Sequence, residues 1–108
     1  MNLFQSNCGR LAPVQVRFEW DDAKAAANLR KHGVSFDEAA EVFADPNALE
    51  DFDPGHSEDE SRFFIIGLSS RRLLYVVFAE RASSAVRIIS ARRADRAERN
   101  KYERAEDR

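Results

Sequence analysis

Residues 31–38 end one helix and begin another, and this stretch constrains the fold more than any other part of the chain. Gly33 suits the left-handed conformation just past a helix end, while Lys31 and His32 place cations at the negative end of the helix dipole. Ser35 and Glu38 have the spacing of a capping box, which satisfies backbone N–H groups in the first turn of a second helix. The sequence therefore predicts two consecutive helices joined by a tight connection.

Capping residues and apolar alternation place the other elements. Asp21 or Asp22 can cap the first helix, which is expected to run from Ala23 to about His32. Asp95 with Glu98 forms another capping box, which begins a final helix. Strands are expected near residues 18–20, near 48–52, and at 62–68, 73–79 and 86–90. The last three are separated by short connections and should form antiparallel hairpins, because parallel strands need a longer crossover.

These elements predict an α+β fold: two N-terminal helices packed on a small antiparallel sheet of about three to four strands in a meander, with a C-terminal helix. Residues 1–16 show no periodicity and are predicted to be a loosely held extension, so the domain is expected at residues 17–108. The single Cys8 excludes an internal disulfide. Since neither a membrane span nor a signal-peptide pattern is found, a cytoplasmic location is expected.

Charge is distributed unevenly, although the net charge is only −2. Residues 45–61 contain seven acids and no Lys or Arg, whereas residues 62–93 contain seven arginines against Glu80 alone. Guanidinium groups present a planar, bidentate donor fork that matches phosphate and carboxylate groups. The arginine-bearing segment therefore favours an anionic ligand or an acidic partner.

The acidic stretch also invites a metal-site interpretation, because it holds the clustered side chains of Asp51, Asp53, His56, Glu58 and Asp59. The spacing does not match a calcium-binding loop, since Pro54 intrudes and Gly55 comes one position early. No metal and no cofactor is predicted. A solvated loop, or a strand that pairs with a basic partner segment, is the preferred interpretation.

Several short motifs follow one another along residues 17–104: Phe18-Glu19-Trp20-Asp21, Lys24-Ala25, Asn28, Lys31-His32-Gly33-Val34, Phe36, Glu38-Ala39, Val42-Phe43, Arg62-Phe63, Ile66-Gly67, Arg87-Ile88-Ile89-Ser90-Ala91-Arg92, Glu98-Arg99 and Tyr102. In content and order they resemble the BrnT family of bacterial type II toxins. Residues 1–16 depart from the family pattern, in which the chain begins close to the Phe-Glu-Trp motif.

The resemblance implies a fold similar to the RelE and ParE toxins and a metal-independent endoribonuclease activity that blocks translation. It also implies neutralisation by a small BrnA-like antitoxin with a ribbon-helix-helix domain, in a complex expected to be 2:2. Toxin and antitoxin together would repress their own operon, with operator DNA contacted only through the antitoxin and with no membrane involved.

Cleavage of RNA by its own 2′-hydroxyl needs a proton acceptor, a proton donor, and positive charge where the phosphorane forms. The candidate catalytic residues are His32, Lys31, Glu80, Arg81 and Arg92. His32 is the natural acid–base group because histidine exchanges protons near neutral pH, and Glu80 is an alternative base. The candidate RNA-binding residues are Lys24, Asn28, Arg62, Arg87 and Arg93.

Each candidate also has a purely structural interpretation. His32 can serve the helix dipole, and Lys24, Asn28 and Lys31 lie at helical spacing on a ridge that faces water or a ligand. Glu80 can pair across strands with an arginine. The alternative function is a non-catalytic interaction module or corepressor, whose basic face binds an acidic antitoxin.

Overall fold

The computed structural model describes residues 16–53, 62–82 and 84–106. Apart from Val16, the predicted N-terminal extension lies outside the described residues. Along the chain the elements are β1 (Arg17–Glu19), α1 (Asp22–His32), α2 (Phe36–Glu41), the 3-10 helix η1 (Val42–Ala44), β2 (Leu49–Phe52), β3 (Phe63–Leu68), β4 (Leu73–Arg81), β5 (Ala85–Arg93) and α3 (Arg96–Glu106).

The strands form one sheet in the order β1-β5-β4-β3-β2. The antiparallel meander from β2 to β5 is confirmed. Two expectations are wrong: the sheet has five strands instead of three to four, and it is mixed, because β1 pairs parallel to β5 with Arg17 opposite Ala85. This pairing joins the start of the domain to a distant part of the chain, so local alternation does not reveal it.

The local helix signals act at the predicted positions, but only half of the capping box at Ser35 forms, because the Glu38 carboxylate bonds to Arg72 and Ser69. The Asp21 carboxylate caps α1 by accepting the Lys24 backbone N–H at 3.0 Å. Gly33 has φ 71° and donates its N–H to the Leu29 carbonyl at 2.9 Å, so it ends α1 in the left-handed conformation. Ser35 Oγ accepts the Glu38 backbone N–H at 3.0 Å and starts α2. In the part of the chain that is described, no helix is long and apolar enough to cross a membrane.

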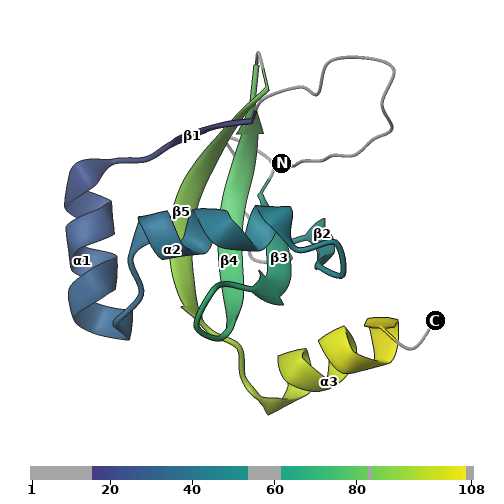
Figure 1. Ribbon diagram of the computed structural model, residues 1–108. Helices are drawn as coiled ribbons and strands as arrows, with labels where there is room; N and C mark the ends of the chain where they lie inside the picture. The colour runs from purple at the N-terminus through teal and green to yellow at the C-terminus, as the bar shows by residue number, and fades with distance from the viewer. Residues whose placement is uncertain (1–15, 54–61, 83, 107–108) are drawn as a thin grey trace.

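The expectation that both N-terminal helices pack on the sheet is wrong for α1. In Figure 1, α2 crosses in front of the sheet, α1 stands beside the edge at β5, and α3 lies at the lower end. The main core fills the space between α2 and the sheet and includes Phe36, Val42, Val76, Phe78 and Ile88. A smaller cluster, with Ile66, Leu73 and Tyr102, holds α3.

Candidate functional site

A β-bulge in β5 decides which side chains share a face of the sheet. Val77 pairs with Ser90 and Phe78 pairs with Ile88, so Ile89 is an extra residue. Regular alternation predicts that Ser90 shares a face with Val86 and Ile88, and the bulge moves it to the other face. Arg87 and Arg92 are five residues apart and would lie on opposite faces of a regular strand. The bulge brings both to the face opposite α2.

We call this side of β4 and β5 the arginine face, defined by Arg81, Arg87 and Arg92. Arg81 belongs to it because Arg81 pairs with Ala85, two positions before Arg87. All three arginines are candidates from the sequence, but local alternation alone does not give them a common face.

Arg92 is held in place by two neighbours. Its guanidinium donates to both carboxylate oxygens of Glu98, at 2.9 and 2.8 Å, and lies 4.3 Å from the ring centroid of Tyr75. The hydrogen bonds from Arg92 to Glu98 raise the pKa of the arginine, so it stays charged. The ring of Tyr75 also stacks on Phe64 at 5.2 Å. This end of the arginine face is therefore preorganised.

Tyr75, which is not among the candidates from the sequence, also belongs to this region. Burial, followed by the carboxylates of Asp53 and Glu98, raises the pKa of the Tyr75 hydroxyl and keeps it a hydrogen-bond donor. Its place opposite Arg92 depends on the register that the bulge sets. A single tyrosine in an apolar strand carries no local signal of that register.

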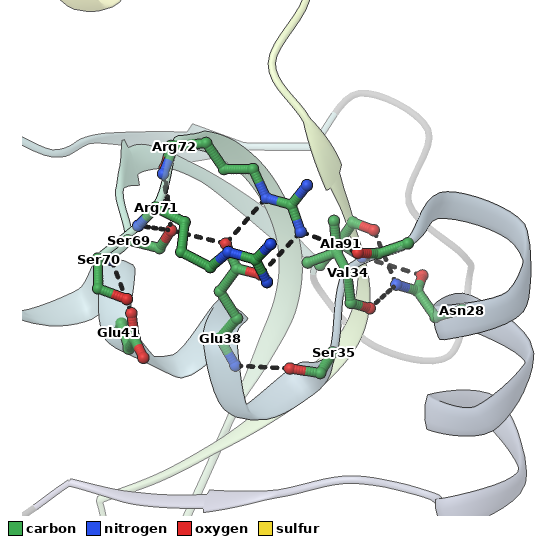
Figure 2. A network of polar contacts seen from close by, with 11 residues as sticks. Asn28, Val34, Ser35, Glu38, Glu41, Ser69, Ser70, Arg71, Arg72 and Ala91 are labelled. Atoms are coloured by element: carbon green, nitrogen blue, oxygen red, sulfur yellow. Dashed lines mark hydrogen bonds and ion pairs between the residues drawn. The ribbon is translucent and has the colours of Figure 1, made fainter.

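Asn28 joins α1 to the edge of β5, as Figure 2 shows. Its Nδ2 donates to the carbonyl of Ala91 at 2.8 Å, and its Oδ1 accepts the Ala91 backbone N–H at 3.1 Å. Nδ2 also donates to the Val34 carbonyl at 3.0 Å. The side-chain amide thus takes the place of a neighbouring strand beyond the point where β1 ends. Asn28 is 7% exposed, so the expectation that it faces water or a ligand is wrong.

Lys31 and His32 follow Asn28 by three and four residues and therefore lie on the same side of α1, one turn further on. Asn28 is bonded to Ala91, and α1 and β5 run in the same direction in Figure 1, so this turn lies toward the end of β5 that carries Arg92 and Arg93. Lys31 is exposed and His32 is half-buried. The structure thus brings the two α1 candidates to the same end of β5 as Arg92.

A polar cluster fixes the connection that follows α1 (Figure 2). Arg72, in the β3–β4 turn, donates to both carboxylate oxygens of Glu38 at 3.0 and 2.9 Å and to the Gly33 carbonyl at 2.8 Å. Ser69 Oγ donates to Glu38 at 2.7 Å. The hydrogen bond from Arg72 lowers the pKa of the Glu38 carboxyl, although burial opposes it. One arginine of the cationic segment therefore has a structural task, which is to hold the end of α1.

Glu80 and Arg81 lie at the opposite end of the sheet. Glu80 is paired with Val86 and points to the face that carries α2, whereas Arg81 lies 3.5 Å from the Glu19 carboxylate on the arginine face. Arg87 is five residues from Arg92, about 16 Å along an extended strand. The five catalytic candidates therefore form two separate groups, with Lys31, His32 and Arg92 at one end and Glu80 and Arg81 at the other.

The remaining candidates are dispersed. Lys24 is exposed in the first turn of α1, far from its C-terminal end. Arg93 is exposed and pairs with Leu74, which places it on the face opposite Arg92. Arg62 precedes β3, two strands away from β5, and its half-buried side chain has a buried Nε for which the described residues provide no hydrogen-bond partner.

The metal interpretation concerns residues that the structure describes only in part. Within residues 16–53, 62–82 and 84–106, no three His, Cys, Asp or Glu side chains gather as metal ligands would. His56, Glu58 and Asp59 lie outside the described residues.

Comparisons with known proteins assign the family. The structure is similar to the crystal structure of the Brucella abortus ribonuclease toxin BrnT, with a TM-score of 0.56 and 24% sequence identity over 76% of this chain and 100% of that chain. Among curated proteins, none matches this chain. The family model described as "Ribonuclease toxin, BrnT, of type II toxin-antitoxin system" matches residues 20–98. The chain therefore belongs to the BrnT family of ribonuclease toxins of type II toxin–antitoxin systems.

Proposed function

We propose that this toxin cleaves RNA at the junction of α1 and β5, with Lys31, His32 and Arg92 at the reacting phosphate. The observation that carries the proposal is the pair of contacts at successive residues of β5. Ala91 is bonded to Asn28 of α1, and Arg92 is bonded to Glu98 of α3. The first contact holds α1, whose last turn carries Lys31 and His32, against β5, and the second holds the Arg92 guanidinium at the end of the same strand.

The chemistry needs no metal. The 2′-oxygen attacks the neighbouring phosphorus and loses its proton, and the 5′-oxygen leaves with a proton, giving a 2′,3′-cyclic phosphate. His32 acts as the acid–base group of this step, while Lys31 and Arg92 stabilise the charge of the phosphorane. Arg87 and Arg81 extend the cationic track along the arginine face, where they would bind the RNA backbone. Glu80, Arg93 and Asn28 are left out of this centre because of their positions.

The proposal extends to the role of the toxin in the cell. We propose that RNA cleavage blocks translation in the cytoplasm, that a ribbon-helix-helix antitoxin neutralises the toxin in a 2:2 complex, and that the two proteins together repress their operon. The type II classification of the family supports the antitoxin. The arginine-rich segment at residues 62–93 supports the binding of an anionic ligand such as RNA.

The test is cleavage of purified RNA in the presence of EDTA. Wild type should cut; His32→Ala should lose about a hundredfold or more of the rate, the usual range for an acid–base group. Arg92→Ala should also lose activity, whereas the matched variant Arg93→Ala, with the neighbouring arginine on the opposite face, should stay within about threefold. Equal losses in Arg92→Ala and Arg93→Ala would refute the proposed centre. Loss of wild-type cleavage in EDTA, restored by Mg²⁺, would refute the metal-independent step.

A further inference from the structure

The outer strand of the sheet, β2, ends a row of aromatic rings. The phenylalanines of this row are in contact from β1 to β2, with ring centroids 4.9–5.5 Å apart, in the order Phe18, Phe43, Phe78, Phe63 and Phe52. The first four are buried or half-buried, but Phe52 is 64% exposed. Aromatic residues, Phe included, are enriched at protein–protein interfaces, so the exposed ring of Phe52 is a suitable anchor for a partner.

Some backbone N–H and C=O groups of β2 point away from β3 and are available to an added strand. Asp53 donates its N–H to the Arg62 carbonyl at 2.9 Å. In an antiparallel ladder, alternate residues bond to the neighbouring strand. Since Asp53 bonds to the β3 side, Phe52 and Glu50 direct their N–H and C=O groups away from β3. The Asp51 carboxylate accepts the Phe52 N–H at 2.8 Å, which leaves Glu50 as the position where an added strand would first pair. Among the described residues, no strand lies beyond β2.

The charge of this edge indicates which kind of strand would fit. Glu50, Asp51 and Asp53 lie on or next to β2, within the segment that has seven acids and no Lys or Arg. Desolvation, and to a smaller degree the Glu80 carboxylate, raise the pKa of Glu50, so a neighbouring cation would be favourable there. A second copy of β2 would instead bring carboxylates opposite carboxylates, which disfavours self-pairing.

From the edge geometry, the exposed ring and the charge, we infer that β2 receives an extended segment of the antitoxin as an added strand. The segment carries a large apolar residue that packs on Phe52 and, two positions away on the same face, a Lys or Arg that pairs with Glu50. The inference rests on the antitoxin partner that the type II family implies and is independent of the residues proposed for cleavage.

The experiment measures the affinity of the full-length toxin for the product of the adjacent antitoxin gene by calorimetry. Phe52→Ser should weaken binding about tenfold or more, whereas the matched control Leu29→Ser, at an apolar residue of α1 that is 51% exposed, should stay within about twofold. Glu50→Pro removes an outward N–H without touching the ladder to β3. It should weaken binding more than Glu50→Gln, which removes only the charge.

RNA cleavage by each variant separates the two proposals, because none of these residues belongs to the proposed catalytic centre. Wild-type cleavage with weakened antitoxin binding supports the inference even if the cleavage residues are assigned wrongly. Unchanged affinity in both Phe52→Ser and Glu50→Pro would overturn it, as would a wild type that does not bind the antitoxin. A toxin dimer that Glu50→Pro dissociates would show that a second copy occupies the edge, and would overturn it too.

Discussion

The junction of α1 and α2 with the sheet and the junction of α3 with the sheet are built differently. At the first, Asn28 and Glu38 are each 7% exposed and their side chains bond to protein groups, beside a core of large apolar side chains. At the second, Tyr102 is the buried apolar anchor of α3, and the Arg92–Glu98 pair remains partly solvated. Water can replace the polar contacts of α3 more easily, so local unfolding of α3 should need less free energy than local unfolding of α1.

The strongest test of the buried junction is Asn28→Ala. The change leaves the N–H and C=O of Ala91 and the Val34 carbonyl without the amide that now satisfies them. We expect a loss of about 3 kcal/mol in the free energy of unfolding, measured in urea. Arg30→Ala, at an exposed position of the same helix, should change it by less than about 0.5 kcal/mol. A loss below about 1 kcal/mol for Asn28→Ala would mean that water reaches this edge.

Glu38→Gln tests the charge in the same junction and should cost about 2 kcal/mol at pH 7, as for a hydrogen bond to a charged group. The pKa of Glu38 is lowered from its ordinary value of 4.5, first by the hydrogen bond from Arg72. The stability from the ionised carboxylate is therefore complete above pH 4.5 and is lost as the pH falls through the lower folded-state value. The free energy of unfolding is measured for wild type and Glu38→Gln at pH 7 and pH 3, and the difference between the two proteins should shrink at pH 3. A gap that persists at pH 3 would show that charge is not its cause, and Glu103→Gln, at an exposed position, provides the control.

Tyr102→Phe tests the α3 junction with a smaller expected effect. The hydroxyl donates to the Asp45 carboxylate at 2.6 Å, and its removal should cost about 1.5 kcal/mol. Hydrogen exchange should accelerate in the amides of α3 and stay unchanged in α1. Equal acceleration in both helices would show that the two junctions open together.

The smallest effect is expected at the exposed end of the sheet. The Arg81–Glu19 pair has a separation of 3.5 Å, with side chains 45% and 46% exposed. Arg81→Gln should therefore change the unfolding free energy by less than about 0.5 kcal/mol. A larger loss of unfolding free energy, measured by thermal or urea unfolding, would show that this end of the sheet resembles the buried junction more than the solvated one.

Local signals predicted most of the elements. Gly33, Asp21 and Ser35 act at helix ends through atoms within a few residues of one another, and Asp95 and Glu98 exchange both hydrogen bonds of a capping box, at 2.9 and 2.8 Å. The box at Ser35 is present only in half, because the Glu38 carboxylate turns to Arg72 and Ser69. The competing partner comes from the β3–β4 turn, which the spacing of Ser35 and Glu38 cannot reveal.

The errors all involve residues that are distant in sequence. The parallel pairing of β1 with β5, the amide of Asn28 on Ala91 and the contact of Arg92 with Tyr75 each depend on tertiary register. Asn28 precedes Lys31 by three residues and His32 by four, so helical spacing assigns it to their polar ridge. Its bonds to β5 depend on tertiary structure and cannot be predicted from this spacing. The candidate residues could therefore be named from sequence, but their division between two ends and two faces could not.

Because of the extra residue at Ile89, the number of residues in β5 decides which face of the sheet its arginines occupy. Replacing Ile89 with another apolar residue keeps the number of residues between Arg87 and Arg92, whereas deleting it keeps every charge and nearly the whole composition. A deletion would nevertheless turn one of those arginines to the side occupied by α2, or force the ladder with β4 to slip by one position. For this strand, tolerance of substitution and intolerance of deletion are expected at the same position.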